Sequence, residues 1–403
     1  MKNDISVSRR SKSSQASVLR RGLSWGVIAL ALAAVGGPAR AETRATPFPA
    51  WPEPQIKASL TVDEAKAIVA ERTKPQTAWK GPTSGPLAAK DATVVYVSDD
   101  QSYVSYVNWG QGVVDAATAL GWNVVVLNGK GTMAGRLGAM QQAVALHPTA
   151  IVTSSDVSAL QVPIKQAIAA NIPVVGIHAT AYPGPNPGLN LYTNITSNPA
   201  EIGGTQAAYV IAVSNGAAKQ VHLLDNNYAI ARFKAKAATD PIKSCAGCKF
   251  LEMSNIPIAD TATRVPPTVS ALLASYGDEW YMTTCCDNFY PYIASALRSA
   301  GASPDKIRLV GSDGPPSAYD MIRKGSFEVA TVPEPSTLFG YEAVDAVVRA
   351  MAGQPPAEFV QPTYLVTRDN IAAEGGDKNQ FIPSNNFACH YANIWKGENQ
   401  PCE

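Results

Sequence analysis

The chain has 403 residues, of which 46% are hydrophobic and only 16% are charged, and it contains 30 glycines and 30 prolines. This composition excludes a disordered polyampholyte and a collagen-like fibre, and the length predicts two domains. The formal net charge of +1 gives no sign of a strongly basic surface, so no nucleic-acid partner is expected.

The first 41 residues have the three-part layout of a secretory signal peptide. A basic stretch precedes an apolar run over 23–35, and Ala39-Arg40-Ala41 supplies small residues for cleavage. We expect residues 1–41 to be removed and the mature protein to reach the periplasm, with Sec export favoured and twin-arginine export left open. Seven of the 33 basic residues and one of the 32 acidic residues lie in this segment, so the mature chain carries a net charge of −5.

Residues 42–90 form a Pro-rich extension with one predicted helix. The helix covers 61–72, with Thr61 as N-cap and Glu64 three residues later, which is the spacing of a capping box. A Gly- and Pro-rich stretch over 81–86 follows. The sequence leaves two roles open for the extension: it wraps on the surface of the protein or it acts as a tether.

From residue 93 onward, short β-branched runs alternate with helical stretches. The first series of expected strands covers 93–98, 122–127, 150–153 and 173–177, with helices near 105–120, 131–146 and 159–170. A second series of strands covers 220–224, 250–253, 280–283, 307–310 and 327–332. Nearly continuous apolar strands joined by helices are typical of parallel sheets covered on both faces. We therefore expect an α/β protein with two doubly wound parallel-sheet lobes.

The motifs of several enzyme and cofactor classes are missing from the sequence. No Gly-x-Gly-x-x-Gly or P-loop follows the first strand, and no nucleophile elbow occurs. With four His in the whole chain, a His-based metal centre is improbable. We therefore expect no cofactor, no metal and no enzymatic activity, and we look for a ligand site beyond the carboxyl ends of the strands.

The six cysteines are expected to form disulfides, because export leads to an oxidising compartment. Their spacing suggests three local pairs, with other pairings left open: Cys245 with Cys248, Cys285 with Cys286, and Cys389 with Cys402. The first pair is interpreted as a structural clip, because it precedes a strand instead of opening a helix as a thioredoxin-like redox motif would.

The order and spacing of segments over residues 90–375 resemble the type I periplasmic binding proteins, in particular the ribose- and galactose-binding branch of ABC transporter substrate-binding proteins. Residues 121–126 resemble the second-strand segment of that family, residues 171–175 the fourth-strand segment, and Val310-Gly311-Ser312-Asp313-Gly314 a late strand and turn that ends in a ligand-binding Asp. The resemblance implies two lobes that close on a ligand about a multi-strand hinge. The expected division is a signal peptide (1–41), the extension (42–90), an N-terminal lobe (91–196 plus 335–365), a C-terminal lobe (197–334 plus 366–380) and a tail (381–403).

Strand ends and matching family positions together give the expected ligand-binding residues, which are Asp100, Tyr103, Tyr106, His178, Asn226, Arg232, Cys286, Asp287, Asp313 and Glu334. The sequence departs from the family at His178, where an Asp-Arg pair is usual. The expected cleft is acidic, with Arg232 as its clear counter-charge. The site carboxylates accept hydrogen bonds from hydroxyl groups and also suit a cationic ligand.

Several of these residues also have a purely structural interpretation. Asp287 and Asp313 could cap the helices that follow them, and Tyr103, Tyr106 and His178 could belong to the core. Because the family places a hinge contact at Cys286, a vicinal disulfide between Cys285 and Cys286 is hypothesised to line the cleft, and two buried thiols are the alternative.

The function implied by the resemblance is sugar transport. The protein would be a monomeric, exported solute-binding protein that captures a small hydroxylated, sugar- or polyol-like molecule and delivers it to the permease of an ABC importer. A periplasmic ligand sensor for a membrane receptor and a binder of a cationic or aromatic small molecule are the alternatives. A LacI-type regulator is disfavoured, because the N-terminus resembles a signal peptide and not a helix-turn-helix.

Overall fold

The structure is a computed structural model that describes residues 57–402. The predicted signal peptide and residues 42–56 of the extension lie outside the described residues. Within the described part, no helix combines the length and the apolar character needed to cross a membrane. Two sheets form the framework, and both belong to one compact unit of the chain.

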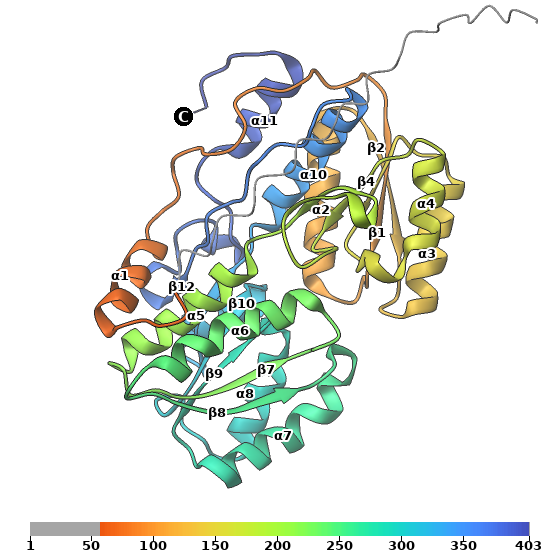
Figure 1. The fold of residues 1–403 in the computed structure, drawn as a ribbon. Helices are drawn as coiled ribbons and strands as arrows, with labels where there is room; N and C mark the ends of the chain where they lie inside the picture. Colours follow the sequence, from red (N-terminus) through yellow and green to blue (C-terminus); the bar gives the residue numbers. More distant parts are fainter. Residues whose placement is uncertain (1–56, 403) are drawn as a thin grey trace, which may run out of the picture. The chain divides into compact units, whose positions relative to one another are not determined.

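The first lobe is built on a six-stranded sheet with the order β2-β1-β3-β4-β6-β5 (Figure 1). Its strands are β1 (Thr93–Ser98), β2 (Asn123–Asn128), β3 (Ala150–Thr153), β4 (Val174–Ile177), β5 (Gly184–Asn186) and β6 (Leu191–Ile195). All pair in parallel except β5, which is antiparallel to β6. Because side chains alternate along a strand, Val94 packs under α2 (Val104–Ala119) and α10 (Ser336–Met351), whereas Val95 packs under α3 (Met133–Ala145) and α4 (Gln161–Ala169).

The second lobe repeats this plan with the strand order β12-β11-β10-β9-β7-β8. Its strands are β7 (Lys219–Leu224), β8 (Lys249–Asn255), β9 (Trp280–Thr284), β10 (Ile307–Asp313), β11 (Glu328–Pro333) and the antiparallel β12 (Val366–Thr367). Helices α5 (Pro199–Val213) and α6 (Ala229–Ser244) lie on one face, and α7 (Thr261–Tyr276) and α8 (Tyr290–Ser299) lie on the other. Helix α9 (Pro316–Lys324) connects β10 to β11.

The predicted fold class is confirmed, and every predicted strand is present with bounds shifted by at most about three residues. Strands β5, β6 and β12 were not predicted. Strand β5 contains Gly184 and Pro185, which indicate a turn in sequence, and β12 has only two residues. The described chain crosses from one lobe to the other at residues 196–198, 334–335 and 352–365. These crossing segments form the multi-strand hinge.

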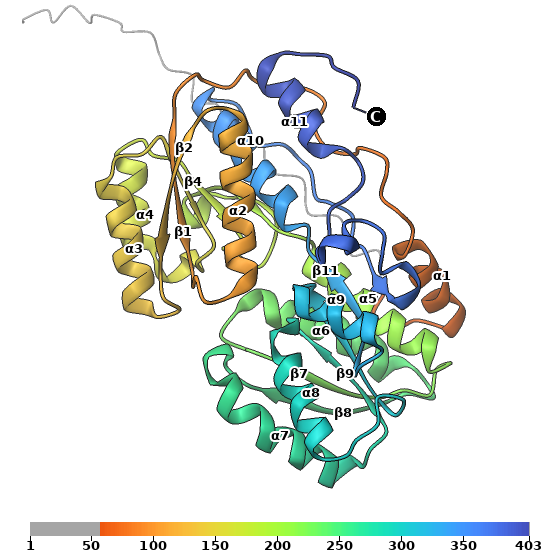
Figure 2. The ribbon, with the colours of Figure 1, turned by 180° about the vertical axis from the view of Figure 1, so that it is seen from behind.

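The described part of the N-terminal extension is fixed to both lobes. Its helix α1 (Val62–Arg72) begins with the predicted capping box, in which Thr61 and Glu64 bond each other's backbone N–H, and it packs on α5 of the second lobe. Farther along the chain, the backbone N–H of Ala88 donates to the Trp395 carbonyl of α11 (Phe387–Lys396), which packs on α10 of the first lobe (Figure 2). The extension therefore wraps on the surface over residues 57–90 and does not act as a free tether there.

Two of the three predicted disulfides are present. Cys245–Cys248 closes the turn between α6 and β8, and Cys389–Cys402 ties α11 to the C-terminal residues. The vicinal disulfide is a wrong prediction, because Cys285 and Cys286 are buried free thiols with their Sγ atoms 3.6 Å apart. The two sulfur atoms are in contact, but their separation is well beyond the S–S bond length of about 2.05 Å.

Candidate ligand-binding cleft

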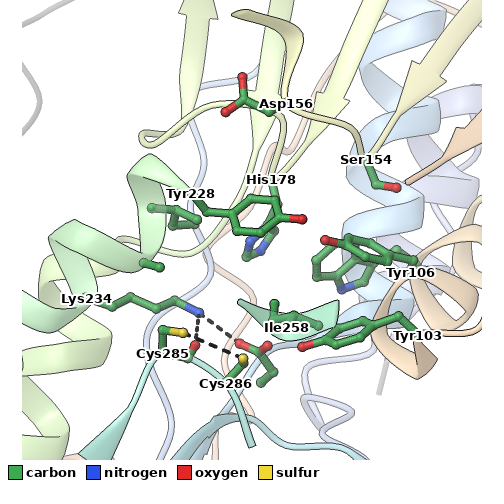
Figure 3. Close-up of a pocket in the computed structure, with 14 residues that line it drawn as sticks. Tyr103, Tyr106, Ser154, Asp156, His178, Tyr228, Lys234, Ile258, Cys285 and Cys286 are labelled. Carbon is green, nitrogen blue, oxygen red and sulfur yellow. Dashed lines mark hydrogen bonds and ion pairs between the residues drawn. The ribbon is translucent and has the colours of Figure 1, made fainter. Parts of the chain in front are cut away.

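A cavity with about 550 Å³ of empty space, including its mouth, lies where the carboxyl ends of the two sheets face each other (Figure 3). Both lobes line it: Tyr103, Tyr106, Trp109, Ser154, Asp156 and His178 come from the first lobe, and Tyr228, Ile230, Ala231, Lys234, Ile258, Cys285, Cys286 and Asp313 come from the second. Figure 3 shows Tyr103 and Tyr106 on the side opposite Lys234 and Cys285.

One wall of the cavity is an aromatic ladder made of Tyr103, Tyr106, Trp109 and His178. The first three lie three residues apart at the start of α2, a spacing that keeps side chains on one face of a helix. Successive ring centroids are 4.9 Å, 5.2 Å and 4.4 Å apart, and the last pair is nearly parallel, with 18° between the Trp109 and His178 planes. Burial raises the pKa of Tyr103 and of Tyr106, so both hydroxyls stay protonated. The ladder presents a broad apolar surface with hydroxyl groups at its edge.

A charge cluster made of Lys234, Asp313, Glu334 and His178 closes the inner end of the cavity. The Lys234 Nζ lies 2.8 Å from an Asp313 oxygen and 3.6 Å from Glu334, and the His178 Nε2 lies 2.9 Å from the other Glu334 oxygen. The Lys234 side chain is 4% exposed and that of Glu334 is 1% exposed. The four groups thus lie in a site of low polarisability, where opposite charges interact strongly.

The pKa values of the cluster follow from this arrangement. Burial by itself lowers the pKa of Lys234, but Asp313 and Glu334 outweigh burial and raise that pKa above its ordinary value. Burial by itself raises the pKa of Glu334, but His178 and Lys234 lower it to about 2. Burial raises the pKa of Asp313, against the opposing effect of Lys234. Glu334 is therefore ionised and Lys234 charged at neutral pH.

A second ion pair lies within the first lobe, and its cation also makes a hydrogen bond to the second lobe. The Nε atom of Arg136, on α3, lies 2.6 Å from one oxygen of the buried Asp99. The Nη2 of Arg136 donates to the other Asp99 oxygen at 2.8 Å. The same Nη2 donates to the hydroxyl of Tyr228, the residue before α6 in the second lobe, at 3.1 Å. Burial raises the pKa of Asp99, and the Arg136 guanidinium opposes this effect. The Asp99 carboxylate thus has its own cation.

The expected site residues fall into two groups. Tyr103, Tyr106, His178, Cys286 and Asp313 line the cavity, and Glu334 lies directly behind it, paired with His178 and Lys234. His178 and Asp313 both have positive φ angles, of 55° and 85°, which are uncommon for residues other than glycine and are often found at functional sites.

The other predicted residues are not part of the cavity lining. Asp100 accepts hydrogen bonds from the backbone and hydroxyl of Ser102 within its own turn. Arg232 does not line the cavity, and it donates to the backbone carbonyl of Asn226 in the loop before α6. The cation of the site is therefore Lys234 and not Arg232, which corrects the expected source of the counter-charge.

Asp287 has a supporting position behind the cavity. Its buried carboxylate accepts hydrogen bonds from the Gly314 backbone at 3.0 Å and from the Thr331 hydroxyl at 2.7 Å, and it thereby fixes the turn that carries Asp313. Burial raises its pKa well above the usual range, and burial beside Asp287 does the same for Glu328. Asp287 and Glu328 therefore form a buried acid pair that keeps a proton in the folded state.

Sequence reasoning missed Trp109, Lys234, Tyr228 and Arg136. Trp109 continues the three-residue spacing of Tyr103 and Tyr106, so helical periodicity could have identified it. Lys234 falls on the same face of α6 as the buried alanines at 231, 235 and 238, and this spacing distinguishes it from Arg232. Arg136 gives no such signal, because its partner Asp99 lies on another element.

The fold and the cleft between its lobes define a binding protein of the periplasmic type. The sequence matches the model of the periplasmic binding protein domain over residues 92–355, and the chain belongs to this family. The recognised resemblance is thereby confirmed, and the family is one of binding proteins and not of enzymes. No curated protein sequence matches the chain.

Solved structures with the same fold are similar over nearly their whole length. A galactofuranose-binding protein has 19% identity and a TM-score of 0.63, covering 72% of this chain and 98% of its own. Two solute-binding proteins of ABC transporters from Agrobacterium vitis are also similar. The one with bound allitol has 18% identity and a TM-score of 0.61, and the match covers 72% of this chain and 98% of that protein. The one bound with α-D-tagatopyranose has 17% identity and a TM-score of 0.63, and the match covers 72% of this chain and 99% of that protein. At these identities the likeness concerns the fold.

Proposed function

We propose that the protein is an exported solute-binding protein that captures a small, uncharged, hydroxyl-bearing molecule in its cleft and delivers it to the permease of an ABC importer. The observation that carries this proposal is the cavity at the carboxyl ends of both sheets, lined by the aromatic ladder on one side and Asp313 on the other. The sugars and polyols bound by proteins of the same fold support a hydroxylated ligand.

The charge balance of the cleft supports an uncharged ligand. Each buried carboxylate at the cavity already lies beside a basic side chain. Asp313 and Glu334 share the Lys234 ammonium, Glu334 also lies 2.9 Å from the His178 ring, and Asp99 pairs with Arg136. A charged ligand would enter this site without an unpaired opposite charge to meet it, and it would lose its hydration. The expectation of an acidic cleft suited to a cationic ligand therefore loses its support.

Binding in this proposal is hinge closure without covalent chemistry. The Arg136–Tyr228 hydrogen bond and the ring contact between Tyr182 and Phe233, 4.6 Å apart, both join one lobe to the other. Such contacts form only when the lobes are together. A ligand that touches both lobes adds to them, and it therefore shifts the population toward the closed state.

Replacing Asp313 by Asn is expected to weaken ligand binding about tenfold or more, because a hydrogen bond to a charged acceptor becomes one to a neutral amide. The measurement is calorimetric titration with the compound that most raises the melting temperature in a screen of monosaccharides, polyols, amines, alcohols and aromatic acids. Asp320→Asn on exposed α9, where Asp320 pairs with Lys324, is the matched control and should bind normally. Equal affinity in the Asp313 and Asp320 variants would refute the site.

A further inference from the structure

Most polar groups that line the cavity are already bonded to the protein. The Ser154 hydroxyl lies 3.0 Å from the Asp99 N–H and 3.1 Å from the Tyr96 hydroxyl, and Asp156 accepts from the backbone and hydroxyl of Ser158. Lys234 pairs with one oxygen of Asp313, and the Tyr228 hydroxyl accepts from Arg136. Among these groups, the second Asp156 oxygen and the O–H of Tyr228 are left for a ligand.

The surfaces that remain for a ligand are mainly apolar. The aromatic ladder forms one wall, and the wall from the second lobe presents Ile230, Ala231, Ile258 and the thiols of Cys285 and Cys286. A free cysteine behaves as a small hydrophobic side chain. Two facing walls of this kind accommodate a molecule whose body is apolar, and an aromatic wall favours one that is flat.

One buried donor in the lining has no partner. The indole Nε1 of Trp109 makes no hydrogen bond to any described residue, although Trp109 is only 4% exposed. A buried N–H without an acceptor costs free energy, so an oxygen atom placed against it gains the full benefit of the bond. The indole ring itself is held in place by its contacts with Tyr106 and His178.

We infer that the ligand is an uncharged molecule with a flat, mainly apolar body and one or two hydroxyl groups, of the class of cyclic or aromatic alcohols, and that Trp109 donates to one of those oxygens. This inference rests on the proposed function of the cleft and narrows its ligand. A monosaccharide ring carries several hydroxyls, each of which is a donor and an acceptor. The groups left to pair them are the Trp109 N–H, the hydroxyls of Tyr103, Tyr106 and Tyr228, and the second oxygens of Asp156 and Asp313, which are still fewer than the donors and acceptors of such a ring.

Matched probes test the inference on the full-length mature protein. Cyclohexanol and myo-inositol share a six-carbon ring but differ in hydroxyl number, and benzyl alcohol and benzoate differ in charge. In calorimetric titrations, we expect cyclohexanol to bind at least about tenfold more tightly than myo-inositol, and benzyl alcohol at least about tenfold more tightly than benzoate. Trp109→Phe keeps an aromatic ring and removes the donor, so it should weaken binding of both alcohols about fivefold.

The outcomes separate this inference from the proposed function. Tighter binding of myo-inositol or D-galactose than of the two alcohols, weakened by Asp313→Asn, overturns the inference and leaves the cleft as a solute site. Failure of both alcohols to bind the wild-type protein overturns the inference as well, and this readout does not depend on whether Trp109→Phe folds. If neither Trp109→Phe nor Asp313→Asn changes the binding of any probe, the site lies outside this cleft. That result overturns the proposed function as well.

Discussion

Replacing Lys234 by Met is expected to destabilise the folded protein by about 3–5 kcal/mol, the usual cost of removing one partner from a buried ion pair. The Met side chain retains the apolar stem of Lys234 but removes the ammonium group that Asp313 and Glu334 both face. Neither carboxylate can regain water without opening the cleft, because their side chains are only 10% and 1% exposed. Urea unfolding followed by fluorescence measures the loss.

Lys236→Met is the matched control on the same helix. Lys236 is 73% exposed and pairs with Asp240 on the surface, so its replacement should change the free energy of unfolding by less than about 0.5 kcal/mol. The double variant Lys234→Met/Asp313→Asn removes a charge of each sign and should recover part of the lost stability. If Lys234→Met were no more destabilising than Lys236→Met, the charge cluster would not have the role described above.

Replacing Glu328 by Gln is expected to stabilise the protein relative to wild type, by an amount that grows with pH. Burial beside Asp287 raises the pKa of Glu328 well above its ordinary value of 4.5. Above pH 4.5 the unfolded chain therefore loses a proton that the folded state keeps, and the stability of the wild type falls as pH rises. The amide has no proton to keep, so its advantage should increase by up to about 1.4 kcal/mol per pH unit.

Unfolding measured between about pH 5 and about pH 7.5 checks this prediction. Glu279→Gln is the control, because Glu279 is 74% exposed directly before β9 of the same sheet, and its effect should be the same at both pH values. A pH-independent difference between Glu328→Gln and wild type would mean that the buried acid pair holds no extra proton.

The framework of the fold was accessible from the sequence because parallel strands buried on both faces leave a strong local pattern. The run over 93–98 became β1 with the predicted bounds, and the capping box at Thr61 and Glu64 formed as expected. The failures are short elements. Strand β5 pairs with β6 although it contains Gly184 and Pro185, because tertiary contact outweighs local preference there.

The site was less accessible because its contacts join residues far apart in the sequence. Asp313 was expected from the turn that follows its strand. Its partner Lys234 lies on helix α6, and the sequence analysis chose Arg232 instead. The balance of charge in the cleft follows from such pairings and not from the number of acidic residues. Cys285 and Cys286 illustrate the same limit, because adjacency in sequence does not determine whether two sulfur atoms form a bond.

Binding of a small uncharged molecule between the lobes can be tested by a crystal structure of the protein with the tightest-binding compound of the screen. We expect density for that compound between the aromatic ladder and Asp313, in contact with both lobes. Density for the compound outside the cleft, with the cavity filled only by water, would contradict it.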